Sequence, residues 1–264
     1  NFFQNSIAES GNLFFIKYSS GDRGIEIYNN TFENNNFSLG YGIYLKDGNE
    51  HLIYNNSFIN STFQGTIEVE GYTKTVWNSS IFNNFINCSS YGGSHGIIFR
   101  DSQNNSAFDN EIIGCSYCIL FHNGSTENQM YNIQLTHCSV GFYIIDKAIN
   151  NTAWNITIEN STTGLHFYRY NDRGNDPPED NLVYDIFINT SKDGLAFTNV
   201  TDKKNTVKDV NITNSTDDDV YAITNSRGAI LINVSYLTSK ENVDSTSNLT
   251  RKWWYRAYVN DTDG

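Results

Sequence analysis

A six-residue phrase recurs along the chain and restricts its fold more than any other feature. The phrase is an apolar residue, an aromatic residue, Asn or Asp, two variable residues and a large apolar residue, as in IYNNTF, IYNNSF and AWNITI. We call its third position the bend position, for the reason given below. It falls at Gln4, Asn29, Asn55, Asn78, Asp109, Asn132, Asn155, Asp185, Asp209 and Asn233, which indicates a basal period of 23–24 residues with a few insertions.

The period and its contents predict a solenoid. A glycine opens a short apolar strand in most periods, and each period holds about three strand-length pieces separated by Asn, Gly or Ser/Asp turns. Leucine-rich repeats need a leucine grid, which is missing, and an antiparallel sandwich would not repeat at constant phase. We therefore predict an all-β fold, a right-handed single-stranded parallel β-helix of about ten coils.

The asparagines of the repeat have a geometric cause. The apolar residues two before, one after and three after the bend position should all face inward, which a straight strand forbids. The chain must bend there, and Asn tolerates the left-handed conformation that a bend requires. Stacked amides could also hydrogen-bond from coil to coil. The expected asparagine ladder is Asn29, Asn55, Asn78, Asn132, Asn155 and Asn233.

This pattern resembles the right-handed parallel β-helix repeat family over residues 3–240. That family includes pectate-lyase-like folds, copper-accessory periplasmic proteins of denitrifiers and Asn-rich archaeal cell-surface proteins. The resemblance implies the fold, and it implies that the Asn position is a turn ladder. It implies no activity, because the repeated residues are structural.

Composition excludes several classes of partner. The net charge of −12 argues against nucleic acid and against an anionic membrane surface, both of which require basic patches. The apolar runs are too short for a transmembrane helix. No signal peptide opens the chain, and residue 1 lies within a repeat, so we expect a processed chain or a fragment of a longer protein.

Eighteen Asn-x-Ser/Thr sequons predict an extracellular glycoprotein. Sequons at the bend position are expected to be poorer acceptors if they are buried. The alternative is that these asparagines only build ladders and turns. The acceptor candidates are Asn36, Asn60, Asn87, Asn104, Asn123, Asn150, Asn160, Asn189, Asn199, Asn214 and Asn248.

Four cysteines are candidates for disulfide bonds. Cys115 and Cys138 share one coil position, Cys88 joins them if the insertion in its coil precedes it, and Cys118 lies one short turn away. Three pairings are possible, and a small buried position that accepts Ser or Cys alike is the alternative. A zinc-type site is not expected, because no second CxxC pair is present and the five histidines do not converge.

Carboxylates are the first candidates for metal-binding or catalytic residues. The insertion at 171–180 offers Asp172, Asp176, Glu179 and Asp180 as weak calcium ligands, and 217–219 is a second acidic run; a solvated loop is the alternative for both. SHGI at 94–97 resembles a His-Gly element of polygalacturonases, but the paired Asp and Arg-x-Lys motifs of that family are missing. We therefore predict no catalytic residue, no cofactor and no enzyme.

A column of aromatic residues directly precedes the bend position and should face outward. Such a strip could stack sugars or contact another subunit, unless insertions or glycans cover it. Its predicted members are Tyr28, Tyr54, Trp77, Phe108, Tyr131, Trp154 and Tyr184.

The repeat ends near residue 240, so we assign residues 1–240 to the β-helix. Residues 241–264 are expected to be a cap, with Trp253, Trp254 and Tyr255 as a plug, or the start of a following immunoglobulin-like domain. The expected function is that of a non-catalytic structural glycoprotein of the cell surface: an envelope, sheath, filament or adhesin component that self-assembles or contacts other surface proteins. The alternative is a carbohydrate-active β-helix protein, either a polysaccharide lyase or glycosidase or a glycan-binding module.

Overall fold

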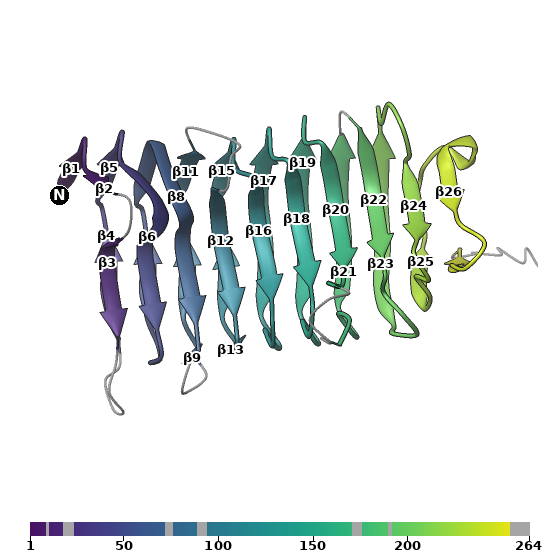
Figure 1. Cartoon of the computed structure of the whole chain (residues 1–264), viewed down its shortest axis with the longest axis horizontal. Coiled ribbons are helices and arrows are strands. Elements are labelled where there is room, and N and C mark those ends of the chain that lie inside the picture. The colour runs from purple at the N-terminus through teal and green to yellow at the C-terminus, as the bar shows by residue number, and fades with distance from the viewer. Residues whose placement is uncertain are drawn as a thin grey trace, which may run out of the picture.

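The protein is a parallel β-solenoid (Figure 1). This computed structural model describes residues 1–8, 11–17, 24–71, 76–88, 94–170, 176–189 and 192–253. In these ranges every named strand pairs in parallel with strands of the adjoining coils, and the helical element present is a short 3₁₀ turn, η2 (Thr238–Lys240). The predicted fold class is confirmed.

No helix within the described ranges is long and apolar enough to span a membrane.

One side of the solenoid, sheet B, receives one long strand from each coil. Ten such strands bound nine full turns, against the ten coils expected: β3 (Asn12–Lys17), β6 (Asn36–Lys46), β8 (Ser57–Glu70), β12 (His95–Arg100), β16 (Tyr117–His122), β18 (Val140–Ile145), β20 (Thr163–Tyr168), β22 (Asp193–Thr198), β24 (Val220–Ile223) and β26 (Glu241–Val243). The short β2 (Ile7–Ala8) pairs with the start of β6.

The other side, sheet A, contains the strand pieces around the bend position, and the first half of β8 belongs to it. Its strands are β1 (Phe2–Gln4), β4 (Glu26–Tyr28), β5 (Thr31–Glu33), β7 (Leu52–Tyr54), β10 (Ser80–Phe82), β11 (Phe85–Cys88), β14 (Ser106–Phe108), β15 (Glu111–Ile113), β17 (Gln129–Thr136), β19 (Thr152–Glu159), β21 (Leu182–Asn189), β23 (Asn205–Thr213), β25 (Ala229–Ile232) and β27 (Leu249–Lys252). A separate small sheet joins β9 (Val76–Trp77) to β13 (Ser102–Gln103).

The predicted bend is present in left-handed backbone conformation. Nine residues at the bend position have φ between 50° and 55°, a region in which Asn and Asp are the favoured residues after glycine: Asn29, Asn55, Asn83, Asp109, Asn132, Asn155, Asp185, Asp209 and Asn233. Because the chain turns there, the residues two before and three after this position both face the core, as Ile53 and Phe58 do.

Two assignments of the bend position were wrong. Gln4 aligns with Glu33, so the phrase FFQNSI is the second half of a coil. Asn78 lies one turn too early: its backbone N–H bonds to the carbonyl of Asn104, and Asn83 is the residue that follows Phe82 into the bend. The assignment failed because most coils have another left-handed position five residues before the bend, occupied here by Asn78 and Asn104.

The expected amide ladder exists, but one residue further along the chain. The bend asparagines are exposed, and some form surface pairs, such as Asn155 Nδ2 to Asn132 Oδ1 at 2.8 Å. The buried ladder follows the bend, where each Oδ1 accepts hydrogen bonds from the backbone and side-chain nitrogens of the preceding coil. It consists of Asn30, Asn56, Asn84 and Asn110, and in later coils the same position holds Ile133, Ile156, Ile186, Val210 and Val234.

A second buried ladder runs through the asparagines four residues before the bend. These residues are at most 1% exposed, and neighbours are joined by Nδ2–Oδ1 bonds of 2.9–3.1 Å; they are Asn105, Asn128, Asn151, Asn181 and Asn205. Each amide also donates to a turn carbonyl, as Asn151 does to Ser125, whose oxygen in addition accepts the backbone N–H of Ile149 from the next coil. The ladders therefore satisfy the polar backbone of the turns inside the rod.

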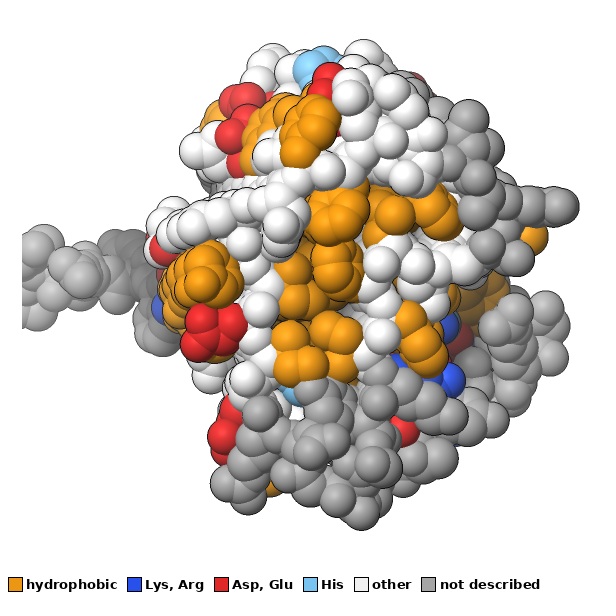
Figure 2. Space-filling model, turned by 90° about the vertical axis from the view of Figure 1, so that its left-hand side faces the viewer, with side chains coloured by type: hydrophobic (Ala, Val, Ile, Leu, Met, Phe, Trp, Pro, Cys, Tyr) orange, Lys and Arg blue, Asp and Glu red, His pale blue; other side chains and the backbone are white. Residues whose placement is uncertain are grey.

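The core is a column of stacked apolar side chains. Figure 2 looks along the rod from the end that carries β1, and apolar side chains fill the middle of that cross-section. Phe32 stacks on Phe58 with ring centroids 4.5 Å apart. The glycine that opens a sheet B strand allows close packing: a Cβ on Gly96 would lie 2.3 Å from the Cys118 carbonyl oxygen.

The solenoid continues past the expected boundary at residue 240. Strand β26 pairs in parallel with β24, and β27 pairs in parallel with β25, so coil geometry extends to Lys252. Trp253 is 62% exposed. The plug residues Trp254 and Tyr255 and the remainder of the predicted cap or immunoglobulin-like segment lie outside the described residues.

Candidate functional site

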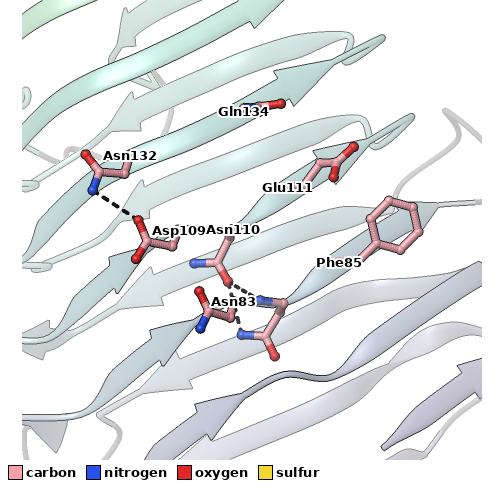
Figure 3. A pocket seen from close by; sticks show the side chains of 8 residues that line it. Asn83, Phe85, Asp109, Asn110, Glu111, Asn132 and Gln134 are labelled. Atoms are coloured by element: carbon pink, nitrogen blue, oxygen red, sulfur yellow. Dashed lines mark hydrogen bonds between the residues drawn. The ribbon is translucent and has the colours of Figure 1, made fainter. Parts of the chain in front are cut away.

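A groove runs along sheet A beside the bend, across three adjacent coils (Figure 3). In each coil the bend residue and the residue two later face outward, while the residue between them faces inward. The two outward rows form the walls, and the first buried ladder forms the floor. The groove has a volume of about 430 Å³ and is lined by Asn83, Asn84, Phe85, Asp109, Asn110, Glu111, Asn132 and Gln134.

Several polar groups of the groove are available for a ligand. Asp109 Oδ1 accepts a hydrogen bond from Asn132 Nδ2 at 3.0 Å. No hydrogen-bond partner among the described residues meets the exposed side chains of Asn83, Glu111 and Gln134. In Figure 3 the Asp109 carboxylate turns toward Asn132, while Glu111 lies on the opposite wall. The walls thus offer neutral amides and separated carboxylates.

Phe85 supplies an apolar surface in the same groove. Its neighbours along the row are Ser57 and Glu111, so no ring among the described residues stacks on it. Its partly exposed ring can therefore contact a flat apolar surface of a ligand.

The aromatic column lies beside the groove and has a different geometry. Phe82, and not Trp77, is its third member; Trp77 pairs with Gln103 in the small sheet. Successive rings are stacked at 4.5–5.8 Å and are within 9° of parallel. Each inner ring therefore has both faces covered by its neighbours, and the column presents ring edges. Sugar stacking, which uses a ring face, is not available along its middle.

Two disulfides join the three coils of the groove. Cys88 bonds to Cys115, and Cys118 bonds to Cys138. The first pair links the coil of Asn83 to that of Asp109, and the second links the coil of Asp109 to that of Asn132. All four predicted cysteines are used, and their oxidation indicates an oxidising compartment. The position that Cys88, Cys115 and Cys138 share is buried and holds Ser61 and Ser161 in the adjoining coils, and the disulfides are formed from it and from Cys118.

A polar cluster lies on the outer face of sheet B, and the repeat gave no sign of it. Glu68 points outward between the core residues Ile67 and Val69, yet it is fully buried. Arg100 Nη1 lies 3.1 Å from Glu68 Oε1, although neither carboxylate oxygen accepts a well-aligned hydrogen bond from the described residues. Arg100 Nε donates to His122 Nδ1 at 3.1 Å. A charged residue inside the apolar strand TIEVE was the available sequence signal.

Burial dominates the electrostatics of this cluster. Desolvation raises the pKa of Glu68 to about 7, and the Arg100 charge opposes that shift. Desolvation, together with the Glu68 charge, raises the pKa of Tyr41 to about 12. The pKa of His95 is lowered to about 4 by desolvation and by Arg100, and its ring packs on Tyr117. The SHGI histidine thus occupies a packed position.

The raised pKa of Glu68 predicts a pH-dependent stability. Because its folded-state pKa of about 7 exceeds the ordinary glutamate pKa of 4.5, stability is fully present below about pH 4.5 and falls as pH rises through 7. The loss is at most about 3 kcal/mol. Urea unfolding at pH 5 and pH 8 should show this fall, and Glu68→Gln should reduce it. An unchanged pH dependence in the variant would contradict the assignment.

The predicted calcium ligands do not form a cluster in the described part of the chain. Asp176 and Asp180 are exposed, and Glu179 pairs with Lys203 Nζ at 2.6 Å. Asp172 lies outside the described residues. In the second acidic run, Asp219 is buried and accepts a bond from the Leu237 N–H. No group of three or more His, Cys, Asp or Glu in the described ranges is arranged to hold a metal ion.

The glycosylation candidates differ in exposure. Asn199 is 6% exposed and donates to the Arg169 carbonyl, so burial disfavours it as an acceptor. The bend sequons are exposed, and burial does not disfavour them. The remaining candidates are exposed at Asn36, Asn60, Asn104, Asn150, Asn160, Asn214 and Asn248, and partly buried at Asn87, Asn123 and Asn189.

Comparison with known proteins agrees with the coil geometry. The profile described as the right-handed beta helix region matches residues 12–176. The chain belongs to this family. Among solved structures, the endo-xylogalacturonan hydrolase from Aspergillus tubingensis superposes with a TM-score of 0.51 at 10% sequence identity, covering 89% of this chain and 74% of the hydrolase. At that identity the likeness concerns the fold alone. No curated protein sequence matches.

Proposed function

We propose that this protein is an extracellular, non-catalytic carbohydrate-binding β-helix that holds a linear polysaccharide in the groove of sheet A. One observation carries the proposal: the three coils that form the groove are the three that the two disulfides join. Covalent links between coils keep the walls in register, and a preorganised site loses less entropy when a ligand binds.

The groove has the chemistry that a sugar chain requires. The free amides of Asn83 and Gln134 can both donate to and accept from hydroxyl groups, and Phe85 can contact the apolar face of a sugar ring. Because the rows repeat once per coil, a polymer along the axis meets similar groups in each coil.

Charge restricts the class of polysaccharide. Asp109 and Glu111 lie in the groove, and the chain carries a net charge of −12. An acidic polymer would be repelled from these walls. The expected ligand is a neutral or amino-bearing glycan, as in an adhesin component of a cell surface.

Binding should depend on Phe85. We expect Phe85→Ala to weaken binding of the best neutral polysaccharide about tenfold, because a ring contact is worth about 1 kcal/mol or more. The matched control is Phe187→Ala, which removes an exposed ring of the same row outside the groove. Affinity gel electrophoresis with neutral, amino and acidic polysaccharides measures the effect. Equal losses in both variants, or binding of acidic polymers alone, would refute the proposal.

A second candidate function is architectural. Two buried amide ladders and the disulfides support a stiff rod that could self-assemble or contact other surface proteins in an envelope, sheath or filament. Sedimentation of the purified protein distinguishes this role. Concentration-dependent polymers would favour it, and a monomer at all concentrations would count against it.

A further inference from the structure

Two exposed rows of left-handed residues run along the groove, and the first of them is one of its walls. The first row is the bend position, and the second lies five residues later. In the coil before the groove these positions are Asn55 and Asn60, with φ of 54° and 49°. In the coil after it they are Asn155 and Asn160, both with φ of 51°. All four asparagines are exposed.

These four asparagines all head sequons, whereas the residues of the same two rows in the coils between them do not. The hydroxyl residues of the sequons are Ser57, Thr62, Thr157 and Thr162. In the intervening coils the bend residues Asn83, Asp109 and Asn132 are followed by no sequon hydroxyl, and the second row holds Gly114 and His137. Sequons therefore stand at both ends of the groove and are missing from its two bordering rows.

We propose that N-linked glycans on Asn55, Asn60, Asn155 and Asn160 frame the groove and leave these two rows bare across the three disulfide-linked coils. In each modification Nδ2 forms a bond to the anomeric carbon of a lipid-phosphate-linked oligosaccharide, loses one proton, and the lipid phosphate leaves. The oxidised cysteines indicate that the chain folds in an oxidising compartment, which is compatible with such a donor. The sugar frame limits access to the groove from the sides and directs a linear polymer along the axis. This effect on binding rests on the proposed function.

Asn87 provides a critical test, because it heads a sequon in a coil that lies between the four framing asparagines. It heads a sequon on β11, but its side chain is partly buried, and the next residue, Cys88, is held in a disulfide. We expect it to remain unmodified. Glycopeptide mass spectrometry of the chain secreted from N-glycosylating cells tests this, with sugar expected at all four framing sites. Occupancy at Asn87, or empty framing sites beside an occupied Asn104, would overturn the inference.

One substitution places a sugar inside the frame. Gln134→Thr creates the sequon Asn132-Ile-Thr, which matches the natural Asn155-Ile-Thr. We expect this variant to carry a glycan at Asn132 and to lose polysaccharide binding at least tenfold. The same variant made without glycosylation should keep more of its binding, which separates the glycan from the loss of Gln134. If the glycosylated variant binds normally, the proposed groove function is wrong. The glycan occupancies of Asn55, Asn60, Asn155 and Asn160 test the proposed frame independently of that result.

Discussion

Replacing Asn151 with alanine is expected to lower the free energy of unfolding by about 4 kcal/mol, the largest effect of any single substitution considered for this chain. Asn151 Oδ1 accepts bonds from the backbone N and Nδ2 of Asn128 at 3.0 and 3.1 Å. Its Nδ2 donates to Ser125 O and Asn181 Oδ1 at 2.9 and 3.0 Å. Removal deletes four buried hydrogen bonds where water has little access, and it deprives the backbone N–H of Asn128 of its acceptor.

The matched control is Asn155→Gly, four residues further along the chain. Glycine adopts the left-handed conformation of Asn155, and the substitution removes one exposed side-chain bond, so we expect a loss below about 1 kcal/mol. Chemical denaturation followed by circular dichroism measures both variants. Similar losses in the two variants would show that the buried ladder has no special importance.

Opening both disulfides is expected to be the second large effect. The bridges close chain segments of 27 and 20 residues, and chain entropy assigns about 3 kcal/mol to each. In a solenoid each coil contacts its neighbours, so destabilisation should concentrate in the three joined coils. Amide hydrogen exchange after reduction should therefore rise over residues 80–138 and much less over residues 182–232.

The control for this experiment is the double variant Cys118→Ser with Cys138→Ser, which opens one bridge and keeps Cys88–Cys115. We expect it to raise exchange mainly in the coils of Asp109 and Asn132. Uniformly faster exchange along the whole rod would contradict the local role of the bridges. A reduced protein that still binds polysaccharide with unchanged affinity would show that the groove is not preorganised by them.

The repeat predicted the solenoid because every coil has the same turn geometry and therefore selects similar residues at the same positions. Asn at the bend is required by local backbone geometry, so the same residue type returns wherever the same turn returns. The bend position was wrongly assigned to Asn78 because Trp77-Asn78 and Phe82-Asn83 both fit the repeat phrase. Only pairing between coils, with Phe82 beside Tyr54, distinguishes them.

The site was less predictable, because it depends on contacts between coils. Glu68 and Arg100 are separated by 32 positions in the chain and meet only through strand pairing. The groove likewise results from two outward rows across three coils, and the members of these rows look like ordinary surface residues in sequence. The cysteines were identified, but the wrong bend assignment at Asn78 misaligned Cys88 with Cys115 and so concealed their pairing.

An experimental structure of the glycosylated protein with a bound neutral oligosaccharide tests the central claim most directly. We predict sugar density along the axis between the two outward rows, with one ring against Phe85 and hydroxyl groups bonded to Asn83 and Gln134. Oligosaccharide bound on the outer face of sheet B, with the groove of sheet A empty, would contradict this account.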